Sequence, residues 1–229
     1  MFKRLVTLCF GFAILASPEL ARADVKVSVV HGIPGAVVDV YANGGLLLED
    51  FVFGTVTPSL SVPAGTYDIK VFLANQDPTS SVPVVSLLGA QLADGQNATV
   101  VAHLSASGAP TLTPFFNDLS SIENGNGLPP AAFASTRLAV RHTALAPTVS
   151  VMANGKALVT LSNGSEAGAN VRTHGYAVWL ALPGTRKPVY GPVNLNLQPG
   201  KLLVVYAVGS IRPEDGTFTL LTQSFDLQD

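Results

Sequence analysis

Two histidines occupy matching positions and are the first residues that could do chemistry. His31 is followed after twelve residues by Gly44, and His142 is followed after twelve residues by Gly155. An imidazole can act as a general base or as a metal ligand. One histidine in each segment falls short of the three or four protein ligands that a zinc site requires. We therefore expect each imidazole to join the end of a strand to the following loop by a hydrogen bond.

Asp39 is the second candidate, because it stands in a run of valines that is typical of a strand. It could form half of a carboxylate pair for acid–base catalysis. No second acid occupies a matching strand position. We therefore expect Asp39 to face solvent or to lie on an edge strand.

One enzymatic alternative stays open, a hydrolase-type enzyme with an interdomain site. It would have to use His31, Asp39, His142 or His174. Two of these side chains within about 4 Å of each other in a cleft would favour it. The chain contains no nucleophile elbow, phosphate-binding glycine loop, paired-histidine zinc helix or dinucleotide fingerprint. The sequence therefore predicts no catalytic, cofactor-binding or metal-binding residue, and it leaves the ligand-binding residues unknown.

An acidic and amide-rich group could in principle hold calcium. It consists of Asp118, Glu123, Asn124 and Asn126. A calcium loop places its ligands in an alternating order that this group does not follow. We predict no metal site there.

Aromatic residues gather near the C-terminal end, where Tyr176, Trp179 and Tyr190 resemble the rings of sugar-binding surfaces. Successive residues of a strand point to opposite faces. Tyr176 and Trp179 therefore cannot form one platform. We expect these rings to pack in a core or between sheets.

The elements that must position these residues are strands. Apolar side chains alternate with polar ones over residues 25–29 and 66–73, which predicts strands with one buried face. Residues 99–104 and 201–208 are more continuously apolar, as central strands are. Asn43-Gly44 and Asn154-Gly155 predict tight hairpins. No helical period extends over ten or more residues after the first 23.

These patterns occur twice, at an offset that falls from 111 to 105 residues. The sequence thus predicts an all-β protein of two tandem antiparallel β-sandwich domains, residues 24–116 and 136–229, each with seven or eight strands. Residues 117–135 contain Asn-Gly-Asn-Gly and Pro-Pro and are interpreted as a linker, with a helical turn near Leu119 to Glu123. The relative orientation of the domains stays open.

Residues 1–23 are interpreted as a secretory signal peptide. Lys3 and Arg4 precede about a dozen apolar or small residues, and Ala21 and Ala23 suit a signal peptidase. The apolar run is too short to span a bilayer, as is every later run. Cleavage after Ala23 would remove Cys9, the only cysteine, which leaves no disulfide and no thiolate site. We expect a periplasmic or extracellular protein.

Composition excludes some partners. Hydrophobic residues make up 48% of the chain and charged residues 12%, which is half the usual share of about 25%. The chain after residue 23 would carry 10 basic and 14 acidic side chains without a basic cluster. We therefore predict no nucleic-acid partner and no membrane span in the mature chain.

The segment from His31 to Gly44 reads HGIPGAVVDVYANG, and a second segment runs from Phe53 to Tyr67. Both resemble signatures of a bacterial secreted domain family of unknown function. Its members read His-x-Ser-Pro-Asp-Ala-Pro before a Val-Asp-Val-Tyr strand. The resemblance implies an immunoglobulin-like or transthyretin-like β-sandwich, often in tandem, and no known activity. The chain departs from it at Gly35, and at Ser150 and Met152 in the second copy.

The leading functional hypothesis is a non-enzymatic exported envelope or extracellular module, binding or structural, that acts through its surfaces. A purely structural spacer, which predicts no pocket, stays open as well. Loops on a rigid β scaffold are a common place for recognition. The partner is unknown; an envelope protein, a second copy of the chain and a polysaccharide are all compatible with the sequence. No cofactor is predicted.

Overall fold

A computed structural model describes residues 24–122, 135–212 and 214–228. These residues contain sixteen strands and no helix. The first half holds β1 (Val25–His31), β2 (Val37–Ala42), β3 (Gly45–Val52), β4 (Leu60–Val62), β5 (Gly65–Leu73), β6 (Val85–Leu92), β7 (Asn97–Leu104) and β8 (Pro110–Phe116). The second half holds β9 (Ser135–His142), β10 (Val149–Ala153), β11 (Lys156–Leu161), β12 (Ser165–Arg172), β13 (Gly175–Ala181), β14 (Pro188–Asn196), β15 (Lys201–Val208) and β16 (Thr219–Asp226).

The two halves share one topology. In the first half the strand orders are β4-β1-β7-β8 and β3-β2-β5-β6, and in the second half they are β12-β9-β15-β16 and β11-β10-β13-β14. Adding eight to each strand number of the first half reproduces the second. The eight strands of each half agree with the predicted seven or eight, and the repeat seen in the sequence is a repeat of structure.

One feature of the predicted sheets is wrong, because they are not purely antiparallel. β1 runs parallel to β7, and β9 runs parallel to β15. Hairpins join sequence neighbours in antiparallel fashion, whereas parallel strands need a long crossover. The four strands of the opposite sheet lie between β1 and β7 in the sequence, and β7 then pairs with β1 in the same direction. The alternation of side chains within a strand cannot predict which distant strand it pairs with.

Local structure follows the sequence closely. Asn43-Gly44 and Asn154-Gly155 form the two-residue turns of the β2–β3 and β10–β11 hairpins, with positive φ at all four residues. Such turns match the twist of the flanking strands. β7 and β15 are buried along most of their length, as predicted for central strands.

Each half is a sandwich with its own core. In the first half, buried valines of β1 and β7 pack against those of β2 and β5 across the two sheets. The second half repeats this arrangement, with residues of β9 and β15 facing β10, β13 and β14. Burial of these apolar faces is the main stabilising contribution to each half.

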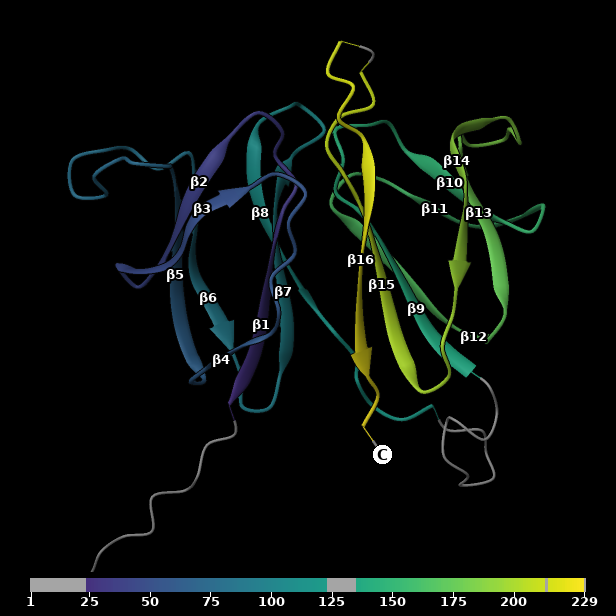
Figure 1. Cartoon of the computed structure of the whole chain (residues 1–229), viewed down its shortest axis with the longest axis horizontal. Helices are drawn as coiled ribbons and strands as arrows, with labels where there is room; N and C mark the ends of the chain where they lie inside the picture. Colours follow the sequence, from purple (N-terminus) through teal and green to yellow (C-terminus); the bar gives the residue numbers. More distant parts are fainter. Residues whose placement is uncertain (1–23, 123–134, 213, 229) are drawn as a thin grey trace, which may run out of the picture.

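The two sandwiches pack against each other through their outer faces. A third apolar cluster joins Val30, Val101 and Phe115 of the first half to Val204 and Tyr206 of the second, among others. Figure 1 shows the sheets that contain β1 and β15 in the middle of the molecule. The domain orientation that the sequence left open is therefore set by a buried interface.

Two sequence predictions fall outside the described residues or lack support there. The signal peptide, residues 1–23, is not described. Residues 117–122 form no helical turn, and Glu123 is not described. Among the described residues, no helix has the length and apolar character that crossing a membrane requires.

Candidate functional site

The two matching histidines bind their own loops, as predicted. His31 Nε2 lies 3.1 Å from the carbonyl oxygen of Ala36, and His142 Nε2 lies 3.0 Å from that of Pro147. In both cases the ring N–H donates to a carbonyl five residues further on. The imidazole thus closes the loop between the first two strands of each sandwich.

The second ring nitrogen differs between the copies. His31 Nδ1 accepts a hydrogen bond from the Ile33 amide at 3.3 Å. His142 Nδ1 is buried and has no hydrogen-bond partner. Since Nε2 carries the proton in both rings, Nδ1 is an acceptor in both. The second loop offers it no donor.

A third buried histidine, His103 on β7, was missed by the sequence analysis. Its Nε2 lies 2.8 Å from Thr113 Oγ1 and its Nδ1 lies 3.0 Å from the Leu104 carbonyl. Burial lowers the pKa of His31, His103 and His142, although a backbone hydrogen bond partly opposes this in each case. All three rings lie near the ends of strands and are almost fully buried, so they act as structural anchors.

Asp39 is not where the sequence analysis placed it. It is 7% exposed and lies on β2, an inner strand flanked by β3 and β5. Its carboxylate accepts hydrogen bonds from the amides of Asp50 at 2.9 Å and Asn75 at 3.3 Å. Both donors have positive φ. The carboxylate thus provides the acceptor for two backbone N–H groups that would otherwise need another partner. The alternation of apolar and polar residues along β2 cannot reveal such partners.

The described part of the chain brings no two of the four candidate enzyme residues into a hydrogen bond or ion pair. His174 stacks on Tyr176, with ring centroids 4.0 Å apart. A cavity of about 320 Å³ between the sandwiches is lined by Arg137, Glu166 and Asn170, among others, and by none of the four.

The acidic and amide-rich group, for which no metal site was predicted, lies largely outside the described residues, which include only Asp118. Its carboxylate pairs with Arg137 at 3.0 Å and accepts a hydrogen bond from Ser120 Oγ at 2.6 Å. That hydroxyl is the main reason why the pKa of Asp118 is lowered. No group of three or more potential metal ligands occurs in residues 24–122, 135–212 and 214–228.

The aromatic residues of the second copy lie on different faces, as predicted. Tyr176 and Tyr190 pack against the core of the second sandwich. Tyr190 also meets Phe218 edge-on at 4.6 Å. Trp179 lies on the opposite face of β13, where its indole N–H donates to the Arg186 carbonyl. The expected core packing is therefore wrong for this ring, which belongs to none of the apolar clusters of the described residues. The three rings form no shared platform.

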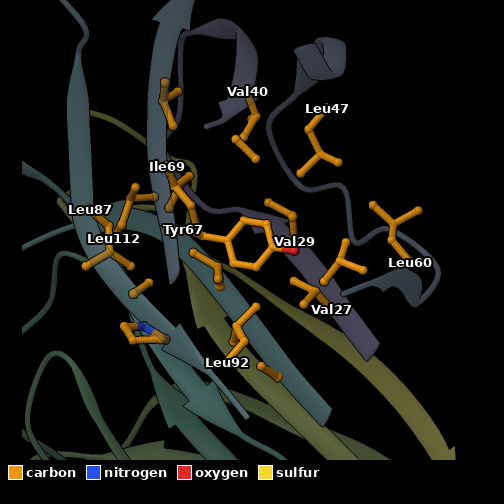
Figure 2. Close-up of a pocket in the computed structure, with 18 of the residues that line it drawn as sticks. Val27, Val29, Val40, Leu47, Leu60, Tyr67, Ile69, Leu87, Leu92 and Leu112 are labelled. Carbon is orange, nitrogen blue, oxygen red and sulfur yellow. The ribbon is translucent and has the colours of Figure 1, made fainter. Parts of the chain in front are cut away.

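The first sandwich contains an apolar cavity between its two sheets, here called the first-sandwich cavity. Its volume is about 200 Å³. The residues labelled in Figure 2 belong to its lining: Val27, Val29, Val40, Leu47, Leu60, Tyr67, Ile69, Leu87, Leu92 and Leu112. The Tyr67 ring points into the middle of this group (Figure 2). Tyr67 is half-buried, and its hydroxyl donates to the Pro63 carbonyl at 2.7 Å.

The rim of the first-sandwich cavity is apolar and exposed. The rim includes Leu88 and Phe116, which are 63% and 50% exposed. Apolar side chains left in water beside an apolar cavity are features of a binding site.

A buried polar cluster joins the two sandwiches, and sequence reasoning missed it. Arg141 on β9 is 1% exposed. Its guanidinium donates to Glu166 Oε2 at 2.5 Å, Asn117 Oδ1 at 2.7 Å and Tyr206 Oη at 3.1 Å. It also lies 4.6 Å from the centroid of the Phe115 ring. Asn117 and Phe115 belong to the end of the first half, so this one side chain ties both sandwiches together.

Further bonds cross the same interface. The Tyr206 hydroxyl lies 3.3 Å from Thr99 Oγ1 of the first half, and within the second half it donates to Gln223 Oε1 at 2.9 Å. Gln223 Nε2 donates to Ser28 Oγ at 2.8 Å. Satisfied networks of this kind select one arrangement of the packed surfaces. Asn117, the first residue of the segment interpreted from sequence as a linker, lies inside this interface.

Two packed sandwiches of identical topology, with an apolar cavity in the first, define a tandem β-sandwich protein. The chain belongs to the family named Domain of unknown function (DUF4397), whose model matches residues 25–152. This match starts at β1, spans the first sandwich and ends within β10. It agrees with the resemblance to a family of unknown function; the specific signature stays a prediction.

No similar protein was found among the curated proteins. Among solved structures, the chain is similar to one described as a "putative cell adhesion protein" from Bacteroides uniformis ATCC 8492, at 12% identity. The match covers 93% of this chain and 100% of that one, with a TM-score of 0.25.

Proposed function

We propose that this protein is an exported, non-enzymatic binding module. The observation that carries the proposal is the first-sandwich cavity, with its exposed apolar rim. The rigid pair of sandwiches supports it, because a fixed scaffold reduces the ordering cost of binding. Export is supported by the N-terminal segment and by the family resemblance. The partner classes compatible with the sequence are an envelope protein, a second copy of the chain and a polysaccharide.

Chemical considerations favour binding over catalysis. His31, His103 and His142 are buried and make structural hydrogen bonds. The Asp39 carboxylate accepts hydrogen bonds from backbone amides. A general base must come within hydrogen-bond reach of a substrate proton. Side chains that already serve the fold at little exposed area are poorly placed for this.

An affinity experiment tests the proposal. Residues 24–229, purified with a C-terminal tag, are incubated with envelope fractions and culture medium of the source cells. Bound material is then identified by mass spectrometry of proteins, glycans and lipids. We expect one class of molecule to be retained specifically. A monodisperse protein that retains nothing, or one that hydrolyses ester or peptide substrates and loses this activity on His142→Ala, would refute the proposal.

A further inference from the structure

We infer that the first-sandwich cavity takes a hydrocarbon chain, such as the acyl chain of a lipid. This inference rests on the proposed binding function and names its ligand. The lining supplies the first argument. Only Tyr67 and Gln91 among the lining residues carry polar side chains. The Tyr67 hydroxyl is bonded to Pro63, and Gln91 Nε2 donates to Thr66 Oγ1 at 2.8 Å.

A polar ligand would therefore lose its hydrogen bonds to water inside the cavity and gain few in return. Burying an amide or hydroxyl without a partner opposes binding. A charged group would be opposed still more strongly, since no charged side chain lines the cavity. The lining thus selects against sugars and peptides and for hydrocarbon.

The extent of the cavity favours a chain over a compact ring. Its lining includes Leu47 and Leu60 from β3 and β4, which are the strands at one edge of the two sheets. It also includes Leu88 and Phe116 from β6 and β8 at the opposite edge. Adjacent strands lie about 4.8 Å apart, so the cavity extends across the width of four strands. The volume of about 200 Å³ exceeds that of the roughly 150 Å³ cavity that accepts benzene.

The exposed rim provides an entry for the hydrocarbon chain of the ligand. Leu88 and Phe116 stand largely in water at the β6–β8 edge, beside the lining. A hydrocarbon chain entering there would cover both side chains and leave its polar head in solvent. The proposal accordingly needs no polar headgroup site within the protein.

The test uses N-phenyl-1-naphthylamine, a dye that fluoresces in apolar surroundings, with residues 24–229. Saturated fatty acids of eight to sixteen carbons, below their micelle concentration, should displace the dye. Val40→Phe and Ala90→Leu add volume to the lining and should each weaken dye and fatty-acid binding at least tenfold. Ala90 lies half-buried on edge strand β6, so its variant should fold even if Val40→Phe does not. Val151→Phe, at the equivalent buried position of β10, is the control and should bind normally.

Each outcome decides. No dye binding, displacement by naphthalene but not by fatty acids, or binding that both filling variants retain would overturn the inference. Dye displacement by phospholipid vesicles but not by free fatty acid would identify the bound hydrocarbon as the acyl chain of a membrane lipid. If the affinity experiment finds a protein or glycan partner while the dye does not bind, the binding function stands and the hydrocarbon ligand fails. If neither experiment finds binding, both fail.

Discussion

Replacing Arg141 by methionine should destabilise the pair of sandwiches by about 3 kcal/mol. The guanidinium makes three hydrogen bonds, and only Glu166 among its partners has appreciable exposure, 33%. Glu166 can regain water when Arg141 is lost, and Tyr206 keeps Gln223. Asn117 Oδ1 is left buried without this donor, at a cost of about 1–3 kcal/mol.

Two further effects set the size of the loss. The cation–π contact with Phe115 contributes about 1–2 kcal/mol when desolvated. Methionine fills most of the space and removes a buried charge, which offsets part of the loss. The sum is a net loss of about 3 kcal/mol, at the lower end of the roughly 3–5 kcal/mol typical of a fully buried pair broken on one side.

The assay is equilibrium unfolding of residues 24–229 in urea, followed by tryptophan fluorescence and circular dichroism. Arg137→Met is the matched control, because Arg137 lies on the same strand and face four residues earlier. Arg137 is itself only 14% exposed, but its partners Asp118, Ser120 and Asn170 are exposed and can regain water. Its loss should therefore cost clearly less than that of Arg141. Equal losses for the two variants, or a loss below about 1 kcal/mol for Arg141→Met, would refute the reasoning.

Three other predictions concern the buried histidines, one glycine and Asp39. Burial lowers the pKa of the three histidines, so the unfolded chain binds more protons than the folded one. The free energy of unfolding should therefore be highest above about pH 7 and fall as the pH drops below about 6.5. A flat profile in urea titrations from pH 5 to 8 would contradict this. Gly209→Ala should lower stability at least twice as much as Gly184→Ala, measured by thermal unfolding. Both glycines have φ near +80°, but a Cβ at Gly209 would lie 2.3 Å from the Thr217 carbonyl oxygen, whereas Gly184 has open space; equal losses would show that the clash relaxes freely. Asp39→Ala should cost about 1–3 kcal/mol in urea unfolding, since two amides lose their acceptor, and no loss would mean that water replaces the carboxylate.

Sequence patterns predicted the local structure well because the causes are local. Alternation over residues 66–73 marked β5, and the Asn-Gly pairs marked two hairpins whose φ angles are positive. The imidazole of His31 bonds to a carbonyl only five residues away, which is why its role could be inferred from the spacing. The repeat was visible because both copies need the same turns at the same places.

Contacts between distant segments had no such signal. The parallel pairing of β1 with β7, the burial of Asp39 and the position of Arg141 depend on strands brought together from more than 20 residues away. The first-sandwich cavity likewise arises from the fit of two whole sheets.

The sequence by itself determined the strands, the turns and their duplication, since side-chain alternation and backbone φ depend on neighbours along the chain. Only the tertiary structure decided which outer faces meet, which polar groups are buried between them and where the two sheets of the first sandwich enclose a cavity. Those properties depend on the packing of surfaces that no single strand contains.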